Sequence, residues 1–150
     1  HTILRRQRQM CIRDREKHIS INQVSNIDLS KLGYAIDQNR GTSFIKEHPA
    51  KDLCLTEIAD NIINGIEVVV VTLDELIKEK VDFIKVDVQG AEIKALTGAK
   101  NLISIYQPDM LVEVTKSHMK DFRKFLETVK YKSVKAFDHG RYVNFYIKHT

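Results

Sequence analysis

The sequence predicts an α/β protein whose sheet is mostly parallel and ends in an antiparallel edge. Three apolar segments at 66–71, 81–88 and 109–114 have the composition of buried strands, and helical patterns separate them. Two alternating segments at 131–137 and 141–148 then flank a short Asp-His-Gly turn, which is typical of a hairpin. This order of elements predicts three layers, with helices on both faces of the sheet.

The first part of the chain carries weaker signals. Spaced apolar residues over 19–29 indicate a helix tail that runs into a strand. Residues 34–45 read as two short strands around a turn at Asn39–Gly41, because asparagine and glycine tolerate positive φ. Apolar residues at helical spacing predict a helix over 55–63, with Gly65 as its C-cap.

The segment after the strand at 66–71 has sharper local signals. Thr72 and Glu75 form a T-x-x-E capping box, which predicts a short helix over 73–79. The next helical pattern covers 91–103, and we expect Gly98 to break it into two pieces.

A further amphipathic helix is predicted over 117–129, with Ser117 as its N-cap. Its apolar face consists of Met119, Phe122, Leu126 and Val129. No internal repeat occurs along the chain.

Charge is distributed unevenly. Six basic and two acidic side chains lie in residues 1–17, whereas the rest of the chain holds 18 of each, so the whole net charge of +4 belongs to this short head. We expect residues 1–17 to be a non-native or disordered basic head, because the stretch looks like translated adapter sequence. No aromatic platform or basic face supports nucleic-acid binding elsewhere, so no nucleic-acid partner is expected.

Cysteine content and hydropathy favour a cytoplasmic protein. Cys11 and Cys54 make neither a disulfide framework nor a CxxC pair. No apolar run approaches the roughly 20 residues that a membrane span needs, so no membrane partner is expected.

Motifs for several common chemistries are missing from the sequence. The histidines show no HxxH or HxxxH spacing, which argues against a zinc site or a hydrolytic triad, and we expect no metal. No phosphate-binding glycine loop, GxGxxG or GxSxG occurs.

Charged side chains at the ends of two apolar strands are the best candidates for a site. Asp87 and Glu113 come near the carboxyl ends of their strands, where open α/β sheets bind ligands. Asp87 accepts hydrogen bonds from an amine or hydroxyl group of a ligand, holds a metal, or caps the following helix. Lys85 either snorkels to the rim or pairs with Asp87 or with an anionic substrate, and Glu92 is either a catalytic acid or a partner of the helix dipole.

Residues 71–114 resemble the core signature of the FkbM-type S-adenosylmethionine-dependent methyltransferases. That pattern is TLD, a strand ending K-x-D-x-E-G-A-E, then L-x-G-A, and a strand ending E-V. The matching residues are Thr72-Leu73-Asp74, Lys85, Asp87, Gly90-Ala91-Glu92, Leu96, Gly98-Ala99 and Glu113-Val114. Gln89 departs from the pattern, since it replaces the usual glutamate and loses a charge.

The resemblance implies a partial Rossmann-like class I methyltransferase sheet over residues 18–150, with strand order 3-2-1-4-5-7-6. On that map 27–36 resembles strand 3, 81–88 strand 4, 109–114 strand 5, and the closing hairpin strands 6 and 7. Strands 1 and 2 and the glycine-rich cofactor loop have no counterpart, so the chain resembles the carboxyl-terminal part of an enzyme. We therefore expect the chain by itself to be inactive.

The resemblance also implies the chemistry and the site. The cofactor is S-adenosylmethionine, and the reaction is methylation, most simply of an oxygen on a glycan or a small polar metabolite. Asp87 and Lys85 are the expected catalytic residues, Asp87 and Gln89 the cofactor-binding ones, and Lys85, Glu92 and Glu113 the substrate-binding ones. The alternative is a non-catalytic α/β binding domain that kept the scaffold. The oligomeric state is left open.

Overall fold

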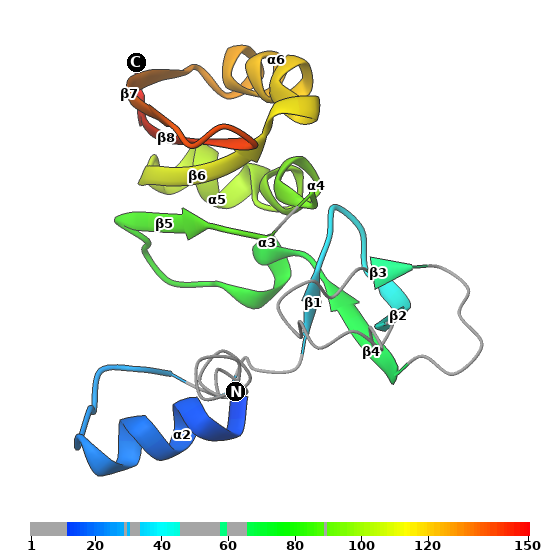
Figure 1. Ribbon diagram of the computed structural model, residues 1–150, viewed down its shortest axis with the longest axis vertical. Helices are drawn as coiled ribbons and strands as arrows, with labels where there is room; N and C mark the ends of the chain where they lie inside the picture. Colours follow the sequence, from blue (N-terminus) through cyan, green and yellow to red (C-terminus); the bar gives the residue numbers. More distant parts are fainter. Residues whose placement is uncertain (1–11, 29, 31–33, 46–57, 60–65, 89) are drawn as a thin grey trace. The chain divides into compact units, whose positions relative to one another are not determined.

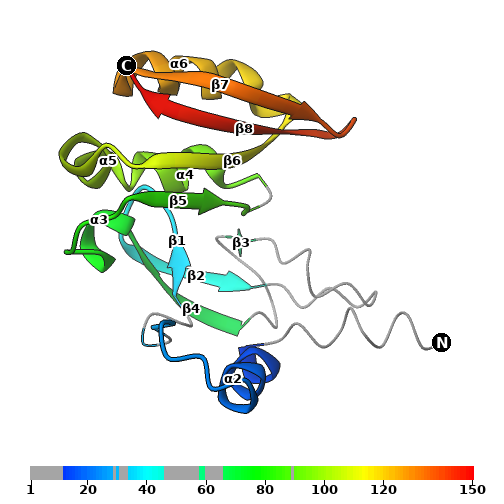
Figure 2. The ribbon, with the colours of Figure 1, turned by 90° about the vertical axis from the view of Figure 1, so that its left-hand side faces the viewer.

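The chain divides into two compact units, and each has its own architecture. The first holds His1–Ala35 and Thr42–Val69, and the second holds Ile36–Gly41 and Val70–Thr150. The computed structural model (Figures 1 and 2) describes residues 12–28, 30, 34–45, 58–59, 66–88 and 90–150.

The first sheet contains short strands, and one helix precedes it among the described residues. The described residues 22–28 contain no strand, so the strand expected after the helix is not found there. The helix also continues across residue 17, where we expect the basic head to end. The end of the head at that residue stays a prediction. The helix is α2 (Ile12–Ile21), and the strands, in the order β1-β4-β2-β3, are β1 (Ala35–Ile36), β4 (Ile66–Val71), β2 (Gly41–Ile45) and β3 (Ile58–Ala59).

Two predictions in this region are confirmed and one is wrong. The two short strands expected around the turn at Asn39–Gly41 are β1 and β2, and the strand expected at 66–71 is β4. The helix expected over 55–63 is wrong at Ile58–Ala59, because these residues form β3, which pairs antiparallel with β2. A short apolar segment fits both the helical and the strand period, and pairing with a partner strand decides which of the two structures forms. The rest of that segment, with Gly65, lies outside the described residues.

The second unit is built on the sheet β5-β6-β8-β7, which Figure 2 shows with its strands side by side. β5 and β6 are parallel, and Val86 lies opposite Val112. β6 and β8 are antiparallel, as are β8 and β7, which form the expected hairpin. The strands are β5 (Phe83–Val86), β6 (Asp109–Thr115), β7 (Tyr131–Asp138) and β8 (Tyr142–His149).

Three of the four strands in this sheet run in one direction, which agrees with the prediction of a mostly parallel sheet. β5 is parallel to β6, and β8 is antiparallel to both β6 and β7, so β5, β6 and β7 share a direction. Helices lie between β5 and β6 and between β6 and β7, whereas a short turn joins β7 to β8. The order β5-β6-β8-β7 corresponds to 4-5-7-6 in the arrangement that the resemblance implies. The remaining part of that arrangement stays a prediction.

The helices of the second unit follow local sequence signals. The capping box is present: the Thr72 hydroxyl accepts from the Glu75 N–H at 3.1 Å, and the Glu75 carboxylate accepts from the Thr72 N–H at 3.2 Å. Ser117 is not the N-cap that was expected, because a 3-10 turn precedes α6 and His118 takes that position. The elements are α3 (Leu73–Leu76), α4 (Glu92–Thr97), α5 (Lys100–Tyr106), η1 (Lys116–His118) and α6 (Met119–Val129).

The helices α3, α4, α5 and α6 all contribute side chains to one hydrophobic core on one face of the sheet. The buried strand side chains alternate with half-buried ones along β6, as expected for a sheet with one covered face. Within the described part of this unit, the three-layer prediction is therefore wrong, because charged side chains such as Lys85 and Glu113 occupy the second face. Of the described helices, none has the length and apolar character to cross a membrane.

A carboxylate joins α3 to the start of α5. Asp74 Oδ2 accepts from the Asn101 N–H at 3.0 Å and Oδ1 from the Leu102 N–H at 2.8 Å. The Asp74 N–H donates to the Gly98 carbonyl at 2.9 Å. These bonds satisfy amides in the first turn of α5 that the helix leaves free, so the TLD segment stabilises the helix pair broken at Gly98.

Gly98 is required by a close backbone approach. A Cβ at this position would lie 2.3 Å from the carbonyl oxygen of Asp37. Asp37 is itself held, since its N–H donates to the Val71 carbonyl at 3.1 Å and its carboxylate pairs with Lys94 at 3.3 Å. The segment therefore has little freedom to move away from a larger residue.

We predict that Gly98→Ala lowers the free energy of unfolding by about 1–3 kcal/mol, the usual cost of overpacking. The control is Gly41→Ala, because an added Cβ there meets nothing within 4 Å. The control is expected to leave stability unchanged or raise it by about 0.4–1 kcal/mol. Urea unfolding measures both, and equal stabilities for the two variants would contradict the close contact.

Asp74→Ala is expected to lower the free energy of unfolding by about 0.5–2 kcal/mol, because it removes a charged cap from α5. Glu127→Ala, an exposed helical position, is the matched control and is expected to change stability by less than about 0.5 kcal/mol. Chemical unfolding followed by circular dichroism gives both values. Equal values for the two variants would show that the Asp74 cap does not stabilise α5.

Candidate functional site

The register of the two parallel strands brings Asp87 and Glu113 together. Val86, the last residue of β5, lies opposite Val112 of β6. The next residue on each strand is therefore Asp87 on one and Glu113 on the other, and neighbouring strands are about 4.8 Å apart. Both carboxylates lie at the carboxyl edge of the sheet, as the sequence predicts.

The electrostatics of this edge are unfavourable for a further negative charge. The pKa of Glu113 is raised, first by burial and then by the charges of Asp87 and Glu92. A hydrogen bond with the side chain of Asn144 and the charge of Lys85 oppose this rise in pKa without cancelling it. Glu113 therefore lies among more negative than positive charge.

Lys85 forms an ion pair with Asp87 on the exposed side of the edge. Its Nζ lies 3.2 Å from Asp87 Oδ2, and the two side chains are 60% and 41% exposed. An exposed pair of this kind stabilises a fold by about 0–1 kcal/mol. Both side chains therefore remain accessible to a ligand at little cost in stability.

A glycine turn leads from this edge into α4. Gly90 has a φ of 94°, which favours glycine, and its N–H donates to Glu92 Oε1 at 2.6 Å. Glu92 is fully buried, so the structure places this expected substrate contact behind the surface of the edge. Gln89, the other expected cofactor contact, lies outside the described residues.

Two residues that the sequence did not single out complete the edge. His118 Nδ1 lies 3.4 Å from Glu92 Oε2 and 3.0 Å from the hydroxyl of Thr115. The ring also covers the turn, because a Cβ at Gly90 would lie 3.8 Å from its Cε1. Thr115 ends β6 and His118 follows three residues later, and position after an apolar strand is the signal that could have found them.

The opposite end of the same face shows a neutralised carboxylate. Asp109, the first residue of β6, accepts from the Tyr146 hydroxyl at 2.6 Å and pairs with Lys148 Nζ at 2.8 Å. These hydrogen bonds hold the pKa of Asp109 below its usual range. The two ends of the sheet therefore differ: the amino end of β6 is an ion-pair cluster, and the carboxyl end has unbalanced negative charge.

A metal centre has no geometric support in the part of the chain that the structure describes. No group of three or more His, Cys, Asp or Glu side chains there is arranged to hold an ion. The carboxylates of the edge instead offer hydrogen-bond acceptors and negative charge to an organic ligand.

Comparison with known proteins places the chain in a family. The model of the methyltransferase FkbM domain matches residues 4–139. No curated protein matches the chain significantly in sequence. The fold is similar to the crystal structure of methyltransferase FkbM from Methylobacillus flagellatus KT, with a TM-score of 0.60 and 18% identity over 90% of this chain and 33% of that one. Because the family model matches most of its length, the chain belongs to the FkbM methyltransferase domain family.

Proposed function

We propose that the chain is part of an S-adenosylmethionine-dependent methyltransferase that methylates an oxygen of a glycan or a small polar metabolite. The observation that carries this proposal is the pair Asp87 and Glu113 at the carboxyl edge of two parallel strands, where negative charge exceeds positive charge. Membership of the FkbM family supports the same reaction class.

The side chains at this edge fit such a cofactor. S-adenosylmethionine supplies an electrophilic methyl group on a positively charged sulfur. Carboxylates attract a cation, and ionised carboxylates accept hydrogen bonds from amino and hydroxyl groups. Asp87, with its half-exposed carboxylate, is the group that we assign to cofactor contact.

The remaining side chains have separate parts in the proposal. Asp87 orients the reactants, since positioning contributes up to roughly 7–11 kcal/mol to such reactions. Lys85 is exposed beside it and faces the acceptor together with Glu113. Gln89 is proposed as a second cofactor contact. Glu92, being fully buried, acts through its neighbours rather than by touching the substrate.

The length of the chain relative to a solved family member bears on whether the chain by itself is active. It spans about a third of the solved FkbM methyltransferase, 33% of that chain. The glycine-rich cofactor loop that the resemblance implies has no counterpart in the sequence, so we propose that the 150-residue chain is inactive by itself. A reducing cytoplasmic location is part of the same proposal, because two cysteines make no disulfide framework.

The test of this function is Asp87→Asn in the product of the complete gene. The variant keeps the size of the side chain and removes its charge, so we expect S-adenosylmethionine to bind about 10- to 100-fold more weakly, as for loss of a charged hydrogen bond. Isothermal titration calorimetry measures the affinity, and transfer of a labelled methyl group measures turnover.

The matched control is Asp82→Asn, at the opposite end of β5, where the carboxylate pairs with exposed Lys80 at 2.7 Å. The control is expected to keep the affinity of the parent protein. Unchanged affinity in Asp87→Asn would contradict the assigned role. A protein that binds the acceptor but never transfers a methyl group would favour the non-catalytic binding domain.

A substitution of Glu113 tests how far the acidic edge lowers the stability of the fold. Its pKa is raised above the ordinary value of 4.5, so the folded chain binds this proton more readily than the unfolded chain. The free energy of unfolding therefore falls as the pH rises from the ordinary pKa of Glu113 through its raised pKa in the folded chain. We predict that Glu113→Gln is more stable than the parent at neutral pH and equal to it below pH 4.5. Thermal unfolding across pH checks this, and a variant that is less stable at neutral pH would contradict it.

A further inference from the structure

The strongest unexplained feature of the second unit is the buried carboxylate of Glu92 behind the acidic edge. Its side chain has no exposed surface, and a buried ionised group is costly unless hydrogen bonds satisfy it. Oε1 accepts from the Gly90 N–H at 2.6 Å. Oε2 faces His118 Nδ1 at 3.4 Å, so the histidine is the second partner that the carboxylate has.

The contact with Glu92 bears on which nitrogen of the imidazole carries the proton. An ionised carboxylate only accepts hydrogen bonds, so the nitrogen that faces it must donate. With the proton on Nδ1, the ring donates toward Glu92 and the Thr115 hydroxyl, which lies 3.0 Å away. With the proton on Nε2, the lone pair of Nδ1 would accept from the Thr115 hydroxyl and would face the carboxylate as a second acceptor, which is the less favourable arrangement beside a buried charge. The Nδ1–H tautomer therefore leaves Nε2 as a basic atom.

The ring is partly exposed beside the candidate site. Its side chain is 36% exposed, so it is not enclosed in the core. It lies over Gly90, which separates Asp87 from α4, and it follows the strand that carries Glu113. A histidine held by a buried carboxylate is the arrangement by which acyl-transfer enzymes orient a general base.

We propose that His118 is the proton acceptor of this site and that Glu92 is the positioning residue that holds it. The inference rests on the proposed methyl transfer and deepens it. The acceptor hydroxyl loses its proton to Nε2 of His118, and the hydroxyl oxygen bonds to the methyl carbon while the methyl–sulfur bond breaks and its electron pair stays on sulfur. The Glu92 carboxylate then stabilises the imidazolium until solvent removes the proton.

Nitrogen NMR of the histidine side chains tests the orientation without any cofactor. At a pH where the ring is neutral, His118 should show a protonated Nδ1 and an unprotonated Nε2. Glu92→Gln should shift the ring toward the other tautomer, because an amide can donate as well as accept. A parent protein with predominantly protonated Nε2 would overturn the proposal, whether or not the variant folds.

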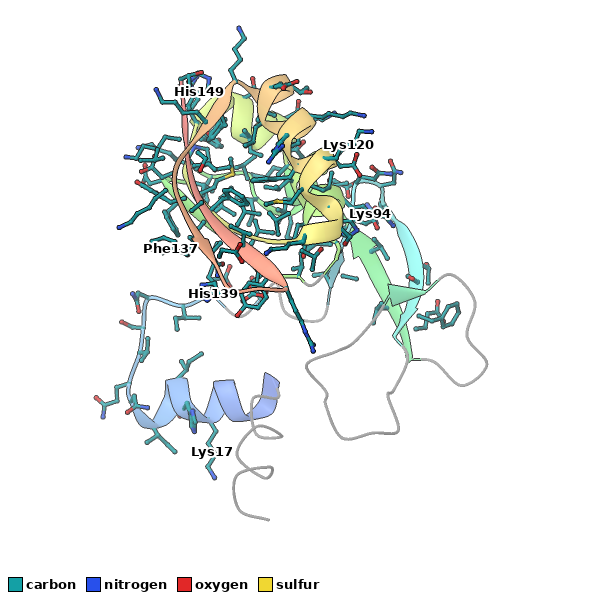
Figure 3. All side chains as sticks on the ribbon, turned by 45° about the horizontal axis from the view of Figure 1, so that its top comes forward. Lys17, Lys94, Lys120, Phe137, His139 and His149 are labelled. Atoms are coloured by element: carbon teal, nitrogen blue, oxygen red, sulfur yellow. The ribbon has the colours of Figure 1, made fainter. Side chains whose placement is uncertain are left out.

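Kinetics of the complete gene product test the chemical role with His118→Asn. Asparagine keeps a donor near Glu92 and lacks a proton-accepting nitrogen, so we expect kcat to fall at least about 100-fold. The affinity for S-adenosylmethionine, measured by calorimetry, should stay within about twofold. His139→Asn is the control, since His139 lies in the hairpin turn (Figure 3) and is expected to keep full activity.

The outcomes separate this inference from the proposed function. Methyl transfer by the parent and an unchanged kcat in His118→Asn would overturn the role of His118 alone. Loss of cofactor affinity in His118→Asn would show a binding role in place of proton transfer and would also overturn it. No methyl transfer by the parent to any glycan or polar metabolite would overturn the proposed function and the inference with it.

Discussion

The parallel pairing of β5 with β6 is the constraint on which the second unit depends. The contact of Val86 with Val112 in register buries both side chains beneath the helices. The same register brings Asp87 next to Glu113 at the carboxyl edge. A slip by one residue would turn charged side chains into the core, because successive residues of a strand face opposite sides. Core packing and the assembly of the candidate site therefore have one common cause.

Glu92 links that core to the edge. It begins α4, whose apolar residues Ala95 and Leu96 are buried in the core, and its carboxylate is bonded to the turn that follows Asp87. At the edge, the burial of Glu113 and the charges of the neighbouring carboxylates cost stability, whereas Asp109 at the other end of the face is neutralised by Lys148. An arrangement that stability alone would not favour is what a site for a cationic ligand requires.

The sequence predicted the elements whose cause is local. The capping box at Thr72, the helix break at Gly98 and the closing hairpin are each specified within a few residues, and all three are present. The strand at Ile58–Ala59 was missed because its partner lies elsewhere in the chain. The contact of His118 with Glu92 was equally out of reach, since the two residues are 26 positions apart and no spacing rule joins them, although the place of His118 after an apolar strand could have marked it as a residue of the edge. The acidic edge itself could be expected, because carboxyl ends of parallel strands meet at one edge.

The central claim is that the edge formed by β5 and β6 binds the methyl donor. Its most direct test is a titration of the isotopically labelled complete gene product with S-adenosylmethionine, followed by amide chemical shifts. We expect the largest changes at residues 85–92 and 113–118, where the carboxylates and the imidazole lie. Changes confined to other parts of the protein, with these two segments unaffected at saturation, would contradict the account.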